Sequence, residues 1–327
     1  LQSCKPDKVP DNPTDFDGFS VPIHFPNPVY DFRNNPITKT GFELGRKLFY
    51  DKNLSLDGTV SCGSCHHQSA GFSDPGKGFS TGVEGKSGLR HAPALANLAW
   101  YPAFMADGGI NHIEVMPIAP LQDSLEMANT MAEIIDYLQH NELYQDMFQE
   151  AFGRDQVTSV HMLRALAQFM SMMISDNSKF DQYLRGEESF SAEEQKGYAL
   201  FQLHCSGCHN GALLTDFSYR NNGLDVYSND EGRARITQLP GDHGKFKVPG
   251  LRNIAVSAPY MHDGRFNTLE EVLDHYIKGI QPAENLDPIL ETPIVLSKEE
   301  KNQLLAFLET LTDYTYLNKP ELSALAE

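Results

Sequence analysis

The chain has 327 residues, of which 40% are hydrophobic and 21% charged, and its formal net charge is -18 at pH 7. A chain of this length exceeds the usual size of one hydrophobic core, so we expect two domains. The acidic balance disfavours nucleic acid as a partner, and no apolar run approaches the roughly 18 residues that span a bilayer.

The N-terminal segment 1–36 is rich in Pro, Asp and Asn, and we expect it to lie extended over the surface as a tether. Cys4 follows Leu1-Gln2-Ser3, which resembles the end of a bacterial lipoprotein signal, where the cysteine is acylated. The alternative is an incidental thiol. On either interpretation we expect an exported, periplasmic protein, and acylation would make it a membrane-anchored lipoprotein.

In the first half, the apolar spacing from Gly41 to Asp51 predicts a helix, which leads to the motif Cys62-Gly-Ser-Cys65-His66. The periodicity predicts further helices over 125–152 and 157–174. Their methionine stripe is interpreted as core filling rather than a ligand set. Its members are Met162, Met170, Met172 and Met173.

In the second half, a capping box of Ser191 and Glu194 opens a helix that runs into Cys205-Ser-Gly-Cys208-His209. Gly-x-x-Leu-Phe precedes both cysteine motifs, at 45–49 and 197–201, which indicates a weak internal repeat. Helices are also expected over 268–277 and 297–311, and a loop over 215–248. The prediction is a mainly α fold of two cytochrome c-like helical domains, 37–186 and 187–327.

Each C-x-x-C-H motif is typical of covalent haem attachment, in which both thiols form thioethers and the histidine ligates the iron. A zinc site or a redox dithiol is the structural alternative. Zinc would need further Cys or His partners close by, and the chain offers only His67 after the first motif. We therefore expect two covalent haem c groups, one on Cys62, Cys65 and His66 and one on Cys205, Cys208 and His209.

Three longer runs resemble the bacterial diheme cytochrome c peroxidase and MauG family. They are Leu251 to Gly264, Arg90 to Asn97, and Asp107-Gly-Gly through Glu126-Met127. The resemblance covers the chain from Gly41 to Leu311. It implies that the haem held by His66 is peroxidatic and that the haem held by His209 transfers electrons.

The resemblance also implies what lies on the far side of each iron. Many family members block the peroxidatic iron with a removable histidine, and this chain has no histidine from Gln68 to Arg90, so an open iron is expected. The sixth ligand of the second iron falls at Tyr276, which would hold the haem potential low. A core tyrosine is the alternative, with His275 and Met261 as replacement ligands.

Glu126 matches the family's distal acid, which can take a proton from peroxide and return it to the leaving oxygen; a solvated or capping carboxylate is the alternative. Two departures from the family pattern concern the positioning of peroxide and the transfer of electrons between the haems. Met116 stands where the family usually has Gln, and Ala106 stands where it usually has a Trp between the haems. Trp100 is interpreted as a packed aromatic, with a displaced relay as the alternative.

The family further implies a calcium ion between the domains, held by the Asn97 side chain and by backbone carbonyls at Ser257 and Pro259. His262 would contact a haem propionate or this interdomain site. Few protein ligands would leave several waters on the ion, so only modest affinity is expected.

The leading hypothesis is a periplasmic peroxidase that reduces hydrogen peroxide to water with electrons from a small donor protein, a cytochrome c or a cupredoxin. The alternative enzyme is a MauG-like oxidase that uses a high-valence state to modify a protein or organic substrate. A non-catalytic diheme electron carrier is the third hypothesis, motivated by Met116 and Ala106. The sequence leaves the oligomeric state open, with a dimer among the alternatives.

Overall fold

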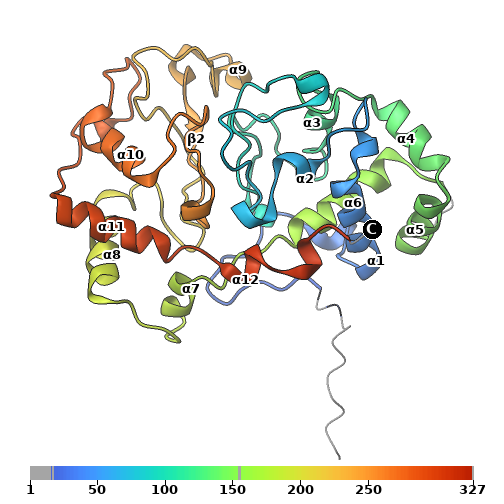
Figure 1. Cartoon of the computed structure of the whole chain (residues 1–327), viewed down its shortest axis with the longest axis horizontal. Helices are drawn as coiled ribbons and strands as arrows, with labels where there is room; N and C mark the ends of the chain where they lie inside the picture. Colours follow the sequence, from blue (N-terminus) through green and yellow to red (C-terminus); the bar gives the residue numbers. More distant parts are fainter. Residues whose placement is uncertain (1–15, 17, 154–155, 326–327) are drawn as a thin grey trace, which may run out of the picture.

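The computed structural model describes residues 16, 18–153 and 156–325, which form two lobes side by side (Figure 1). Of the N-terminal tether predicted over 1–36, residues 1–15, with Cys4, and residue 17 lie outside the described part of the chain. Within the described part, Phe25 and Tyr30 are buried in the first lobe, so this segment is anchored to the core. None of the described helices is long and apolar enough to cross a membrane.

The first lobe is built from helices joined by long loops. Their bounds are α1 (Lys39–Tyr50), α2 (Cys62–Cys65), α3 (Ile118–Gln122), α4 (Met131–Gln139), α5 (Glu142–Phe152) and α6 (Ser159–Ser171). The helix predicted over 125–152 is divided in two, because Asn141 caps the start of α5 with its side chain. Met162, Met170 and Met173 are buried in the core, as predicted for the methionine stripe.

The second lobe contains the next helices and one short antiparallel strand pair. Their bounds are α7 (Lys179–Leu184), α8 (Ala192–His204), β1 (Tyr219–Arg220), α9 (Ala234–Thr237), β2 (Phe246–Lys247), α10 (Leu269–Asp274) and α11 (Lys298–Glu309). The capping boxes predicted at Ser191 and Ser297 are both present. The prediction of a mainly helical chain is confirmed, although α10 is shorter than expected and continues as a π-helical turn over His275–Gly279.

Each lobe is centred on a crossed pair of helices, α1 with α6 and α8 with α11. Gly45 permits the first crossing, since a Cβ there would meet the Ala165 carbonyl, and Gly197 permits the second against Gln303. Separate hydrophobic clusters surround the two pairs. Both halves of the chain therefore repeat one packing arrangement, while their division into the domains 37–186 and 187–327 stays a prediction.

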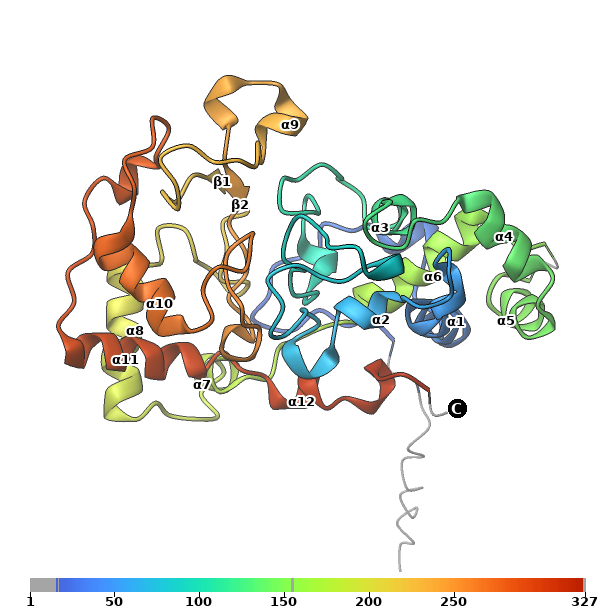
Figure 2. The ribbon, with the colours of Figure 1, turned by 45° about the horizontal axis from the view of Figure 1, so that its top comes forward.

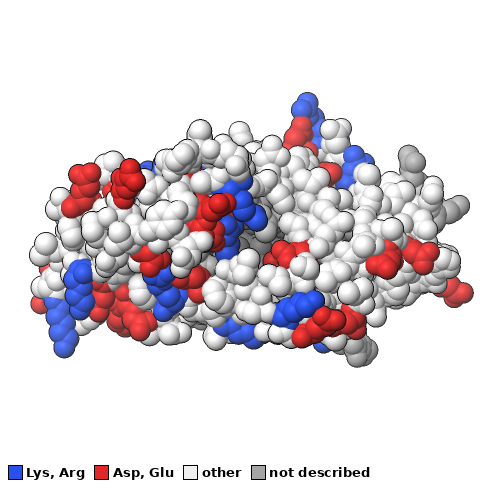
Figure 3. Space-filling model, turned by 90° about the horizontal axis from the view of Figure 1, so that it is seen from above, with Lys and Arg blue, Asp and Glu red and all other residues white. Residues whose placement is uncertain are grey.

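The lobes are joined by polar contacts and by the C-terminal segment, where α12 (Tyr314–Leu317) returns to the first lobe (Figures 1 and 2). Arg90 of the first lobe pairs with Asp230 of the second at 2.6 Å. Within the second lobe, Arg252 pairs with Asp181 of α7, and both side chains are buried. Asp181 also lies 2.6 Å from the Nε2 of His24, in the segment that packs on the first lobe. In the view from above, basic and acidic side chains gather around the hollow between the lobes (Figure 3).

Candidate functional site

The first site is built on α2, which Ser61 and Ser64 cap reciprocally, so that His66 lies at the helix end. The Nδ1 of His66 donates a hydrogen bond to the Phe72 carbonyl at 2.7 Å, because a carbonyl can only accept. This leaves the Nε2 of His66 with a free lone pair. Burial lowers the pKa of His66 to about 4, so the ring is neutral at pH 7, as an iron ligand must be.

The thiols of the first motif have properties that disfavour a redox dithiol. Burial, followed by the neighbouring Cys65, raises the pKa of Cys62 to about 12, whereas reactive cysteines have lowered pKa values. Cys62, Cys65, Cys205 and Cys208 are all unpaired. The described residues contain no cluster of three His, Cys, Asp or Glu side chains suited to a metal ion.

Glu126 lies in the turn between α3 and α4, where its carbonyl accepts the Val83 N–H at 2.8 Å. Burial, and then the nearby Asp123, raises the pKa of Glu126 to about 7. The charge of Glu126 also raises the pKa of Cys62 and Cys65, so its carboxylate lies within electrostatic range of the first motif. The structure thus brings this predicted acid to the first site.

The second site begins where α8 ends, at Cys205. The Nδ1 of His209 lies 3.1 Å from the carbonyl oxygens of both Leu214 and Pro249. These acceptors leave the Nε2 of His209 free, and burial lowers the pKa of the ring. Both motif histidines therefore have the same orientation relative to their backbone partners.

Tyr276 lies in the π-helical turn, with its hydroxyl 3.5 Å from the Nδ2 of Asn222. The Sδ of Met261 lies at the same distance from that nitrogen, so both side chains converge on Asn222. Burial raises the pKa of the Tyr276 phenol, with smaller contributions from Cys205 and Cys208. The phenol is therefore close to the second motif, and its role as an iron ligand stays a prediction.

His275 faces away from this point, because its Nε2 lies 2.9 Å from the Asn222 carbonyl oxygen, to which it donates. Of the two replacement ligands, Met261 is thus better placed. Asn222 was not singled out from the sequence, where it falls within the loop expected over 215–248. A π-helical turn beside a C-x-x-C-H motif has no local sequence signature that would have pointed to Asn222.

Of the residues predicted to bind calcium, Asn97 uses its side chain in contacts within the protein. The Asn97 carboxamide bonds at both ends to the backbone of Ser175, at 2.9 and 3.1 Å. The Ser257 hydroxyl donates to the Ile254 carbonyl at 3.3 Å, and Pro259 follows a cis peptide bond. The calcium site stays a prediction, and the bonds of Asn97 account for that side chain without an ion.

Of the two family departures, Met116 packs against the hydrophobic cluster of the first lobe, and Ala106 lies at the lobe junction. Trp100 is buried, and its indole N–H donates to the Pro26 carbonyl at 2.7 Å, as expected of a packed aromatic. The Ala106 carbonyl accepts the backbone N–H of Lys247 at 2.8 Å, across the lobe junction. His262 lies at the same junction, stacked on Phe246 with ring centroids 3.8 Å apart.

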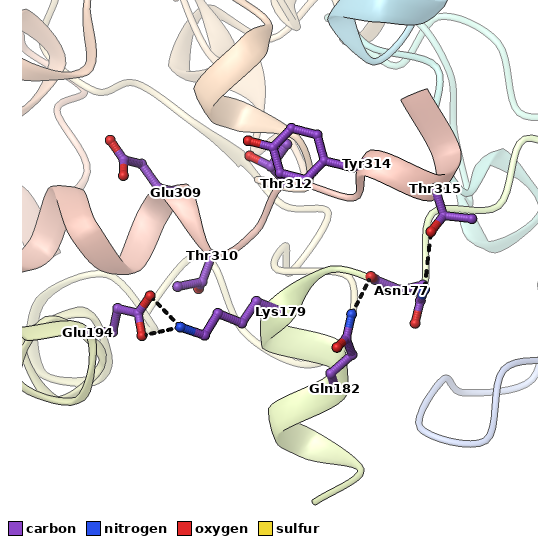
Figure 4. Close-up of a pocket in the computed structure, with 9 residues that line it drawn as sticks. All are labelled: Asn177, Lys179, Gln182, Glu194, Glu309, Thr310, Thr312, Tyr314 and Thr315. Carbon is purple, nitrogen blue, oxygen red and sulfur yellow. Dashed lines mark hydrogen bonds and ion pairs between the residues drawn. The ribbon is translucent and has the colours of Figure 1, made fainter. Parts of the chain in front are cut away.

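A hollow of about 290 Å³ opens beneath the segment between α11 and α12 (Figure 4). Lys179 and Glu194 face each other there at 2.7 Å, and Asn177 donates to Thr315 at 3.2 Å. None of the predicted site residues lines it. The hollow is therefore separate from the two cysteine motifs.

Comparison with known proteins gives consistent results. The family model described as di-haem cytochrome c peroxidase matches residues 39–189. The chain is 36% identical to the methylamine utilization protein MauG of Methylorubrum extorquens, covering 90% of this chain and 83% of MauG. It is 32% identical to the cytochrome c551 peroxidase of Nitrosomonas europaea, covering 83% and 79%.

Two solved structures are also similar. The crystal structure of a MauG-like protein associated with microbial copper homeostasis superposes with a TM-score of 0.86 at 32% identity, over 94% of this chain and 99% of the other. The diheme peroxidase BthA from Burkholderia thailandensis has a TM-score of 0.74 at 21% identity, over 89% and 91%. The second likeness concerns the fold alone.

Proposed function

Because this chain belongs to the di-haem cytochrome c peroxidase family, we propose that it is a periplasmic enzyme that reduces hydrogen peroxide to water at the first of two covalently attached haems. The observation that carries the proposal is the partly buried Glu126 near the first motif, with a pKa of about 7. A general acid and base works best when its pKa lies near the working pH.

Each C-x-x-C-H motif fits a covalent haem. The thiols are unpaired, and each histidine bonds through Nδ1 to a backbone carbonyl. That bond fixes the ring and makes Nε2 a better donor to iron. A haem bound at the first motif supplies an iron that can bind peroxide and accept oxidising equivalents.

At the first site, Glu126 in its ionised form takes a proton from the oxygen of peroxide that approaches the iron. The same carboxyl group then returns this proton to the far oxygen, which leaves as water. Burial keeps the pKa close to neutral, so both the proton-accepting and the proton-donating form are accessible. Reduction of peroxide to water consumes two electrons and two protons in total.

At the second site, His209 and Tyr276 are the residues that would hold the iron of a bound haem. A phenolate ligand favours the ferric state and lowers the reduction potential, which suits a haem that gives an electron to the first site. Two electrons from a small donor protein, a cytochrome c or a cupredoxin, reset the enzyme. The net charge of -18 favours a donor with a basic contact surface.

A second candidate function is a MauG-like oxidase that modifies a protein or organic substrate. Three observations favour it: Tyr276 near the second motif, the absence of histidine from Gln68 to Arg90, and 36% identity to a MauG protein. The two enzymes differ in how quickly electrons from a donor protein are consumed. An acyl anchor at Cys4 is compatible with either.

Steady-state kinetics with peroxide and reduced cytochrome c test the proposal. Rapid oxidation of the cytochrome supports the peroxidase, whereas slow turnover with a long-lived high-valence spectrum supports the oxidase. Electron paramagnetic resonance of the resting protein adds a second measurement. If both haems are six-coordinate and low-spin and neither reacts with peroxide, the result supports an electron carrier and contradicts both enzyme hypotheses.

A further inference from the structure

Lys247 is a cation at the junction of the two lobes. It belongs to β2, and its backbone N–H donates to the Ala106 carbonyl of the first lobe at 2.8 Å. Its ammonium donates to the Ala103 carbonyl at 2.7 Å and lies 5.1 Å from the centre of the Tyr101 ring. The side chain of Lys247 is thus fixed by contacts on the opposite lobe.

The charge of Lys247 has no counterion in contact. Among the described residues, no carboxylate oxygen lies within 4.0 Å of its ammonium. Arg90, at the same junction, differs because it pairs with both Asp107 and Asp230 at 2.6 Å. Burial lowers the pKa of Lys247 to about 8, and Asp107 offsets this only in part. A desolvated ammonium with one carbonyl partner retains unused N–H donors, which suit a carboxylate.

Lys247 also lies on the segment that orients the second motif. Two residues further along, the Pro249 carbonyl lies 3.1 Å from the Nδ1 of His209, and the Val248 carbonyl accepts from the Thr215 hydroxyl at 2.6 Å. The segment is therefore held against the second cofactor site while the lysine reaches the first lobe. Every haem carries two propionate carboxylates, which are the anionic groups that a haem at either motif would bring to a protein interior.

We propose that Lys247 binds a haem propionate at the junction between the lobes, which rests on the proposed function because it requires haem at these motifs. The bound propionate supplies the counterion that the protein itself does not provide. In return, the ammonium offsets the negative charge of the propionate beside the iron. Removal of the ammonium therefore lowers the reduction potential of the haem whose propionate it binds, since a nearby cation favours the reduced iron.

The test is a potentiometric titration of both haems in the holoprotein and in Lys247→Met, with Lys247→Arg as the charge-preserving variant. Lys245→Met is the matched control, because it removes the same charge two residues away, where the ammonium pairs with Asp242 at 3.2 Å. We expect Lys247→Met to lower the potential of one haem selectively. We expect Lys247→Arg to retain the wild-type value, and Lys245→Met to have little effect.

The haem whose reduction potential shifts is the one whose propionate contacts Lys247. A change in the propionate bending band of that haem in the resonance Raman spectrum supports a direct contact. Equal shifts of both haems, or a shift no larger than that of Lys245→Met, overturn the inference and leave the peroxidase proposal intact. A wild-type protein without two histidine-ligated haems overturns the inference and the proposed function together.

Discussion

Gly45 of α1 packs directly on the backbone carbonyl of Ala165 in α6, so that a side chain at position 45 would have no space. The two helices cross at this point, and Phe49 packs against Phe169 one turn further along, with ring centroids 5.2 Å apart. Because the obstacle is backbone, it cannot move aside as a flexible side chain would.

We expect Gly45→Ala to lower the free energy of unfolding by about 1–3 kcal/mol, the usual cost of overpacking a core. Chemical denaturation followed by circular dichroism measures this. Gly241→Ala is the control, since a Cβ there meets no atom within 4 Å, and its effect should stay within about 0.5 kcal/mol. Equal effects of the two variants would contradict the close packing.

Much of the local structure followed from the sequence because its signals are local. The capping boxes at Ser191 and Ser297, the spacing of apolar residues in α1 and the two C-x-x-C-H motifs each depend on residues a few positions apart. The assignments of Tyr276 and Glu126 came from the family resemblance. Their proximity to the motifs agrees with it, while their chemical roles remain predictions.

Long-range partners could not be read from the sequence. Asn97 and Asn253 both adopt left-handed backbone conformations, and each accepts a backbone N–H, from Ser175 and Asp313 respectively. These pairs lie 78 and 60 residues apart, and only the folded chain brings them together. The internal repeat of the two halves has a further sequence signal, because Met-Ala-Asp-Gly at 105–108 matches Met-His-Asp-Gly at 261–264.

Replacement of Glu126 tests its proposed role in peroxide cleavage. We expect Glu126→Gln to slow the reaction with peroxide by on the order of 10²-fold, because glutamine cannot accept the proton. Stopped-flow absorbance at the haem bands measures the rate. Glu150→Gln, on the exposed face of α5, serves as the control and should react like the wild type. A Glu126→Gln variant that reacts normally would remove this residue from the mechanism.

The pH dependence of the same reaction gives an independent test. The pKa of Glu126 is raised to about 7, and only the ionised carboxylate can accept the peroxide proton. The rate should therefore rise as the pH increases through about 7 and level off above it. In Glu126→Gln this rising limb should disappear. A limb that persists in the variant would have to come from another group.

Ligation by Tyr276 predicts a selective change at the second haem. In Tyr276→Phe we expect loss of the low-spin ferric signal of that haem and a rise in its reduction potential, because the phenolate donor is removed. Electron paramagnetic resonance and potentiometry measure both effects. Tyr260→Phe is the control, since that buried tyrosine donates to the Ile254 carbonyl at 2.8 Å.

If Tyr276→Phe keeps the wild-type signal and Met261→Leu loses it, the thioether is the ligand in place of the phenol. Met261 is the natural comparison, because its sulfur lies as close to the Nδ2 of Asn222 as the Tyr276 hydroxyl does, at 3.5 Å. The two ligands also have opposite effects on the reduction potential of the haem, since methionine raises it whereas tyrosine lowers it. The resting potential of the wild type therefore favours one of them before any variant is made.

Arg252 and Asp181 form a buried ion pair. It holds α7, which carries Asp181, against the loop that carries Arg252. The two guanidinium nitrogens lie 2.7 and 2.8 Å from the two carboxylate oxygens. Burial alone would raise the pKa of Asp181, but the hydrogen bonds from Arg252 outweigh it and lower the pKa to about 2. The carboxylate is therefore charged at pH 7, and removal of the arginine leaves that charge buried.

We expect Arg252→Met to lower the free energy of unfolding by about 3–5 kcal/mol, the usual cost of breaking a buried pair by removing one partner. Arg265→Met is the control, because Arg265 pairs with Asp225 and Asp263 at the surface, where such pairs contribute about 0–1 kcal/mol. Adding Asp181→Leu to Arg252→Met should recover part of the loss, since the unpaired charge is then gone. A double variant that is less stable than Arg252→Met would show that Asp181 acts mainly through its bonds to His24 and Ser178.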